Sequence, residues 1–77
     1  GTVIRYATAV DGPVELSIYN LAGQRIAQLQ AGWRAAGAHT LAWDGRNSTG
    51  EMLASGIYIY RLQTGEGAVA RKLLLLR

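Results

Sequence analysis

Oxygen-bearing side chains gather in one short segment of the chain, and oxygen atoms are the ligands that calcium takes in proteins. These side chains belong to Asp44, Asn47, Ser48, Thr49 and Glu51. An EF-hand loop needs glycine at its sixth position and a bidentate glutamate at its twelfth. Counted from Asp44, those positions hold Thr49 and Ser55, so the pattern fails. We expect the aspartate and asparagine to bind amides of their own loop as Asx-turns, with calcium in another geometry as the alternative.

His39 is the one histidine in the chain, and cysteine is absent. A structural zinc site draws its ligands mainly from cysteine and histidine, and a nucleophilic triad needs a base between a nucleophile and a carboxylate. The sequence offers neither set, no carboxylate pair at an acid–base spacing and no phosphate-binding glycine loop. We therefore predict a protein that is not an enzyme and has no cofactor or metal. His39 is expected near a strand end with a backbone partner.

Trp33 and Trp43 could stack on sugar rings, because an indole ring offers a flat apolar face. Trp43 shares the alternation of His39 and Leu41, which places it in the core. Trp33 lies in a glycine-flanked stretch and is the better candidate for exposure. A carbohydrate-binding accessory module therefore stays an alternative function, and it requires a second exposed aromatic ring beside Trp33.

Apolar and polar side chains alternate along much of the chain, a pattern that predicts β-strands. We therefore expect strands to position the residues named above. Val14, Leu16 and Ile18 show the alternation most clearly. Turn residues separate the predicted strands, and those at 20–23 predict a hairpin. The pattern predicts an all-β, antiparallel β-sandwich of about six or seven strands. The strands expected are residues 2–7, 14–19, 24–30, 38–43, 57–63 and 68–77.

The segment after the hairpin is ambiguous. Ile26, Leu29 and Trp33 recur at helical spacing among good helix formers, which makes a short helix the alternative. Gly32 interrupts that pattern, and a short hairpin connection requires a second strand that pairs with the first. We therefore predict a strand over residues 24–30 followed by an irregular stretch.

A turn-rich loop at residues 44–55 joins the fourth and fifth predicted strands. The residues expected to hold it structurally are Trp43, Asp44, Gly45, Gly56 and Tyr58. In immunoglobulin domains a tyrosine near the start of the sixth strand bonds backbone at the preceding corner. Tyr58 stands directly after such a corner, two residues before Tyr60. We predict that the Tyr58 hydroxyl bonds backbone of the loop.

The last predicted strand ends in leucines with basic residues on both sides. This segment consists of Lys72, Leu73, Leu74, Leu75, Leu76 and Arg77. Alternation places Leu73 and Leu75 on one face of the strand and the other two leucines on the opposite face. One pair can fill the core, and the other faces outward or needs a second cover. The segment is either a closing strand alone or also a surface that another protein recognises, by edge pairing for example.

Composition limits the remaining function classes. A chain of 77 residues with 49% hydrophobic residues is enough for one small globular domain, expected to span residues 1–77. The net charge of +3 comes from arginines scattered along the chain, whereas nucleic-acid binding favours a clustered basic face. No apolar run approaches the length of a membrane helix. The chain starts without methionine, and we expect it to be a piece of a longer protein.

Three segments together resemble a known family: IYNLAGQRIAQL at residues 18–29, AGAHTLAWDGRNSTGEMLASGIYIYRL at 36–62 and RKLLLLR at 71–77. In order and spacing they resemble the C-terminal sorting domain of type IX secretion in gram-negative bacteria. They are similar also to the immunoglobulin-like domain of flagellar hook-capping proteins, to which those sorting domains are related. The resemblance covers essentially the whole chain. It implies an immunoglobulin-like sandwich of about seven strands.

The sorting-domain resemblance implies a non-catalytic module at the end of a larger secreted protein. Such a module reaches the outer membrane through the periplasm, is recognised by a translocon, and is commonly cleaved by a sortase that attaches the cargo to the cell surface. The family's basic–apolar–basic element corresponds to Lys72, the four leucines and Arg77. Its turn glycines correspond to Gly23, Gly37, Gly45, Gly50 and Gly56, where they would serve positive φ or a close approach of the backbone. The hook-capping resemblance implies instead a structural domain that binds sister subunits.

Overall fold

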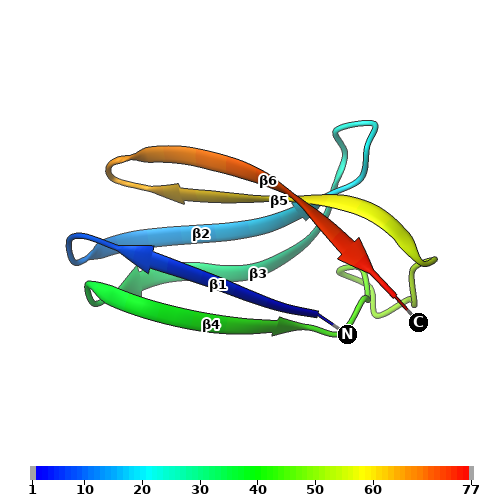
Figure 1. Cartoon of the computed structure of the whole chain (residues 1–77), viewed down its shortest axis with the longest axis horizontal. Helices are drawn as coiled ribbons and strands as arrows, with labels where there is room; N and C mark the ends of the chain where they lie inside the picture. The colour runs from blue at the N-terminus through cyan, green and yellow to red at the C-terminus, as the bar shows by residue number, and fades with distance from the viewer. Residues whose placement is uncertain (1, 77) are drawn as a thin grey trace.

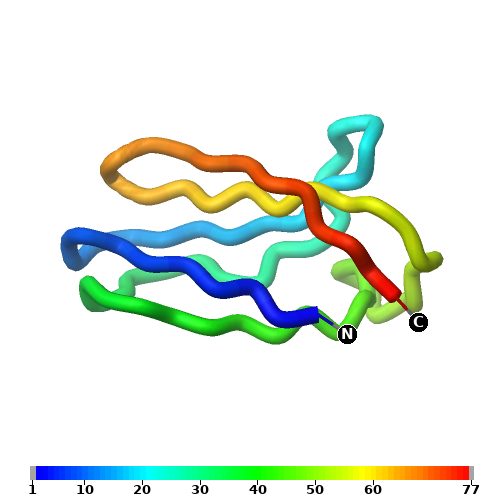
Figure 2. The backbone as a smooth tube through the Cα atoms, in the orientation of Figure 1, coloured from blue at the N-terminus to red at the C-terminus, as the bar shows by residue number. Residues whose placement is uncertain are grey.

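The computed structural model describes residues 2–76 and shows strands without any helix over that range (Figure 1). No helix of the described residues could therefore span a membrane. The strands are β1 (Thr2–Thr8), β2 (Gly12–Tyr19), β3 (Arg25–Arg34), β4 (Gly37–Trp43), β5 (Gly56–Thr64) and β6 (Gly67–Leu75). The two ends of the described chain lie at the same end of the molecule (Figure 2).

Two antiparallel sheets form the fold. β1 pairs with β4 in a two-stranded sheet, and the other sheet has the order β3-β2-β5-β6. The predicted antiparallel sandwich is confirmed, with six strands among the described residues in place of about seven. The region between β4 and β5 adds no strand, because residues 44–55 make only one isolated bridge, Arg46 to Met52. Turn residues fill this region and keep it folded on itself as a loop.

The core lies between the sheets and follows the predicted alternation. Leu16 and Ile18 of β2 are completely buried, and Ile4 of β1 faces them from the smaller sheet. Trp43 closes the same cluster at the end of β4, where its side chain is 1% exposed. The core prediction for Trp43 is therefore confirmed. Burial of large apolar side chains of this kind is the main source of stability in a domain this small.

The strand predicted over residues 24–30 is confirmed to within one residue at its start, whereas the irregular stretch predicted after it and the alternative helix are wrong. The strand continues to Arg34, without a helix or an irregular stretch. Gly32 interrupts the helical pattern, but in the ladder it pairs with Val14 at a φ of +132°, a conformation that glycine adopts without a steric penalty. Pro13 pairs with Trp33 just beyond it. The ladder to β2 thus extends a strand that local sequence alone would end.

The hairpin predicted between β2 and β3 is confirmed. Asn20 and Gln24 exchange backbone and side-chain hydrogen bonds, and the Asn20 Oδ1 atom accepts the amide of Gln24 at 2.9 Å. Gly23 has a φ of +86° and donates its amide to the Asn20 carbonyl oxygen at 3.0 Å. The other four turn glycines named above also have positive φ. The role expected for these glycines is therefore confirmed.

Candidate functional site

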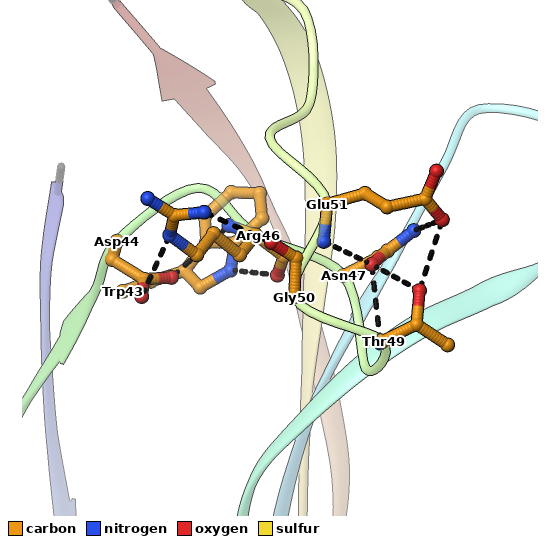
Figure 3. A network of polar contacts seen from close by, with 7 residues as sticks. All are labelled: Trp43, Asp44, Arg46, Asn47, Thr49, Gly50 and Glu51. Carbon is orange, nitrogen blue, oxygen red and sulfur yellow. Dashed lines mark hydrogen bonds and ion pairs between the residues drawn. The ribbon is translucent and has the colours of Figure 1, made fainter.

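The oxygen-rich loop uses its side chains to fold itself (Figure 3). Asp44 Oδ1 accepts the amide of Arg46 at 3.0 Å, and Asn47 Oδ1 accepts the amides of Thr49 at 3.1 Å and Glu51 at 2.9 Å. The prediction that the aspartate and asparagine bind amides of their own loop is confirmed. Within residues 2–76, no group of three or more His, Cys, Asp or Glu side chains is placed to hold a metal ion.

The loop is also tied to both sheets. The Trp43 indole nitrogen donates to the Arg46 carbonyl oxygen at 3.0 Å, which fixes the loop against the core (Figure 3). Ser48 donates its amide to the carbonyl oxygen of Ile26 in β3 at 2.9 Å. Gly45 is buried with a φ of +79°, and its carbonyl oxygen accepts the amide of Leu53 at 2.9 Å. These bonds anchor the loop at residues 44–55 to β3 and β4.

Glu51 responds to pH through this network. Hydrogen bonds from the Asn47 amide and the Thr49 hydroxyl lower the pKa of the Glu51 carboxyl group below its usual value of 4.5. A lowered pKa in the folded state stabilises the fold above the unfolded pKa, and that contribution is lost as pH falls through the folded pKa. Glu51→Gln is therefore expected to unfold more easily than the native protein at neutral pH, but equally easily in acid. Urea unfolding at about pH 7 and about pH 3 checks this.

The native protein and Glu51→Gln should differ only where the carboxylate is ionised. Glu66→Gln is the control, because the Glu66 side chain forms no hydrogen bond or ion pair with another described residue. A difference between native protein and Glu51→Gln that stays constant down to low pH contradicts the prediction.

Tyr58 binds the C-terminal end of the loop at residues 44–55. Its hydroxyl donates to the Ala54 carbonyl oxygen at 2.7 Å, as predicted from its position after the corner. Its ring meets the Trp43 ring edge to face, with centroids 5.4 Å apart at 79°. Trp43, Tyr58 and the loop between them therefore form one packed unit, which supports the structural roles expected of these residues.

Tyr58→Phe keeps the ring contact but leaves the Ala54 carbonyl oxygen without this donor. We expect the free energy of unfolding to fall by about 0.5–1.5 kcal/mol, the net contribution of one hydrogen bond. Chemical denaturation measures this. Tyr19→Phe is the control, because the Tyr19 hydroxyl forms no hydrogen bond with any described residue. Unchanged stability of Tyr58→Phe contradicts a structural role for the hydroxyl.

The remaining aromatic and histidine residues take structural positions. His39 Nε2 lies 2.8 Å from the Ala35 carbonyl oxygen, and its ring stacks on Tyr6, with centroids 5.2 Å apart. The backbone partner predicted for His39 is thus confirmed. Trp33 is 60% exposed, as expected. Among the described residues its ring contacts no other aromatic ring, so the sugar-binding alternative lacks the second ring that it requires.

The four leucines near the end of the chain point alternately inward and outward, as alternation predicts. Leu73 and Leu75 are buried, at 8% and 0% exposure, and join the core. Leu74 and Leu76 face outward, at 51% and 67% exposure. Lys72 is exposed and lies on the same outer face as Leu74. Arg77 lies outside the described residues.

Ile57 of β5 is the register partner of Leu74 and is also exposed. We call Ile57, Leu74 and Leu76 the outer leucine patch. It lies next to the edge of the larger sheet, because β6 pairs only with β5. An edge strand with free backbone groups and exposed apolar side chains is a surface that other strands can pair with. Of the segment expected to contact a partner, Leu74, Leu76 and Lys72 are therefore available at the surface.

A second surface feature, which the sequence analysis missed, lies between β1 and β6. Two adjoining cavities of about 250 and 300 Å³ share Ala7, Leu62 and Val69 in their walls. We call the pair the lateral groove. Thr8 lines one end of it, and the only signal in the sequence was that Thr8 continues the inward series of Ile4 and Tyr6.

Comparison with protein-family models gives a match over most of the chain. A family model described as FlgD Ig-like domain matches residues 2–68. No curated protein and no solved structure matches the chain. The match runs from β1 to the start of β6, so the segment carrying the outward leucines lies beyond it. Together with the two antiparallel sheets, it confirms the predicted immunoglobulin-like sandwich.

Proposed function

Because the chain belongs to the FlgD Ig-like domain family, we propose that it is a non-catalytic structural module of the hook-capping type, which joins its parent protein to sister subunits. The loop at residues 44–55 supports this proposal, since the Asp44 and Asn47 side chains accept amides of the loop itself and so serve the fold.

The observation that carries the proposal is the unpaired edge of β6 beside the outer leucine patch. Leu74 and Leu76 place apolar side chains in solvent on a sheet whose last strand has no outer neighbour within the described part of the chain. Protein–protein contacts remove such groups from water and satisfy the free backbone groups of the edge. We expect a sister subunit to cover this surface.

Sedimentation velocity over a range of concentrations tests the assembly function. The native chain is expected to self-associate, and Leu76→Glu to remain monomeric, because a charge at the patch opposes its burial. Leu21→Glu is the matched control, since Leu21 in the β2–β3 turn is 66% exposed against 67% for Leu76. A native chain that stays monomeric, or equal loss of association in both variants, contradicts assembly through this patch.

A second candidate is the C-terminal address of type IX secretion, and a specific observation favours it. Lys72 lies on the outer face with Leu74 and Leu76, which gives a basic and apolar surface where the sorting-domain resemblance has its basic–apolar–basic element. In this function an outer-membrane translocon and a sortase bind the folded domain. The parent protein then passes through the periplasm and becomes secreted or attached to the cell surface.

A reporter fusion distinguishes the two functions. The domain is fused behind a periplasm-exported reporter in a bacterium with the type IX system. Deleting the last residues would remove Leu73 and Leu75 from the core, so Leu74→Ser with Leu76→Ser is the better variant. Leu21→Ser is the control. If only the double variant loses surface display of the reporter, the result supports the secretion-signal function. If the native fusion stays in the periplasm, the result contradicts that function.

A further inference from the structure

The inner face of β6 is covered at one end and open at the other. Leu73 and Leu75 are buried, whereas Val69 on the same face is 47% exposed. β1 and β6 belong to different sheets, and β6 forms one edge of the larger sheet, beside β5 (Figure 2). The lateral groove lies at the open end of the inner face, between Ala7 of β1 and Val69 of β6.

The groove borders a free strand edge. Within residues 2–76, β1 pairs only with β4, so the backbone groups on its other edge have no strand partner in that range. Leu62 and Val69, register partners in β5 and β6, form the apolar wall opposite. An extended chain in the groove could pair with β1 and place every second side chain on this wall.

Thr8 supplies an independent indication that something is missing from the groove. Its side chain is 7% exposed and lines the groove, yet its hydroxyl oxygen has no hydrogen-bond partner among the described residues. Buried polar side-chain atoms usually have a partner, because water is excluded from them. A backbone group of a strand paired with β1 would provide one.

The charges around the groove define what it would bind. Arg5 and Arg71 line one end, and Glu66 lines the other. None of the three forms an ion pair with another residue of the described range. A strand antiparallel to β1 would begin beside Glu66 and end beside the two arginines. It therefore needs a basic residue first, apolar residues at alternate positions, and an acidic residue last.

We propose that the lateral groove binds an extended peptide segment of another protein, which adds a third strand to the β1–β4 sheet. The edge from Arg5 to Thr8 accommodates about four or five residues of such a segment. This surface is separate from the outer leucine patch. Failure of either function above would therefore leave peptide binding in the groove unaffected.

A synthetic peptide tests the proposal with the full chain. The probe is acetyl-Lys-Val-Thr-Val-Glu-amide, and the comparison peptide has lysine and glutamate exchanged. Titration followed by amide chemical shifts is expected to move the signals of β1 from Arg5 to Thr8 and of β6 from Ala68 to Arg71. The exchanged peptide is expected to bind at least about tenfold more weakly. Absence of binding at millimolar peptide, shifts confined to other strands, or equal affinity of the two peptides overturns the proposal.

Two variants on neighbouring positions of β6 locate the binding. Val69→Asp places a charge on the groove wall and is expected to weaken binding at least about tenfold. Ala70→Asp places the same charge on the opposite face of the strand and is expected to leave binding unchanged. Both positions are exposed, so both variants should fold. Equal effects of the two variants on peptide binding overturn the proposal. The proposal is also overturned if the native chain self-associates and Val69→Asp abolishes that association, because a second copy would then fill the groove.

Discussion

Trp43→Ala is expected to abolish cooperative folding of the domain at room temperature. Trp43 is 1% exposed, packs edge to face on Tyr58 and donates its indole N–H to the Arg46 carbonyl oxygen. Large-to-small replacement of a buried tryptophan costs about 3–5 kcal/mol. A domain of this size has a total stability at the lower end of about 5–15 kcal/mol, so the loss is comparable to the whole. Urea unfolding followed by far-ultraviolet circular dichroism measures it.

Trp33→Ala is the matched control for this experiment. Trp33 is 60% exposed on β3, so its replacement is expected to change the free energy of unfolding by no more than about 0.5 kcal/mol. The contrast separates core packing from the general loss of an aromatic residue. A Trp43→Ala protein that unfolds cooperatively within about 1 kcal/mol of the native chain contradicts the central role of this side chain.

The second large effect is expected at Leu75. Leu75→Ala removes a side chain that is completely buried, at a cost of about 2–5 kcal/mol. Leu74→Ala removes the same atoms from a side chain that is 51% exposed, so the cost should be no more than about 0.5 kcal/mol. Thermal and urea unfolding of the two proteins compare adjacent positions of one strand. Equal destabilisation by the two replacements contradicts the orientation of β6.

The same pair separates stability from recognition. Leu74→Ala should weaken whatever contact the outer leucine patch makes while the fold remains intact. Leu75→Ala should reduce binding only in proportion to the unfolded fraction. A partner assay that loses signal in Leu75→Ala but not in Leu74→Ala, at equal folded concentration, contradicts the assignment of the patch.

Local patterns in the sequence were enough where the interaction itself is local. Alternation identified the inward face of β2, and the Tyr58 hydrogen bond joins residues only four positions apart. The Asx-turns at Asp44 and Asn47 also lie within a few residues of their partners. Such features depend on side-chain chemistry and short chain geometry, which the sequence displays directly.

Features that depend on distant partners could not be predicted. Gly32 looks like the end of a strand until its pairing with Val14 is known. Alternation separated Leu73 and Leu75 from Leu74 and Leu76 but did not tell which pair is buried. That depends on how β6 pairs with β5, where Leu75 lies opposite Gly56. The lateral groove depends on which strands share a sheet and how widely the sheets separate. No short segment of the sequence contains that information.

The strand order also decides how the chain can reach its folded state. The β2–β3 and β5–β6 hairpins join neighbouring segments and can form within microseconds. The central pairing of β2 with β5 joins Tyr19 to Ile59, and the intervening chain includes β3, β4 and the loop. Closing so long a segment before its contacts form makes such topologies fold in about milliseconds to seconds. We therefore expect docking of the two hairpins to set the pace of folding. Until the smaller sheet packs on the larger one, the inner face of β6 is open to other chains as well as the outer face.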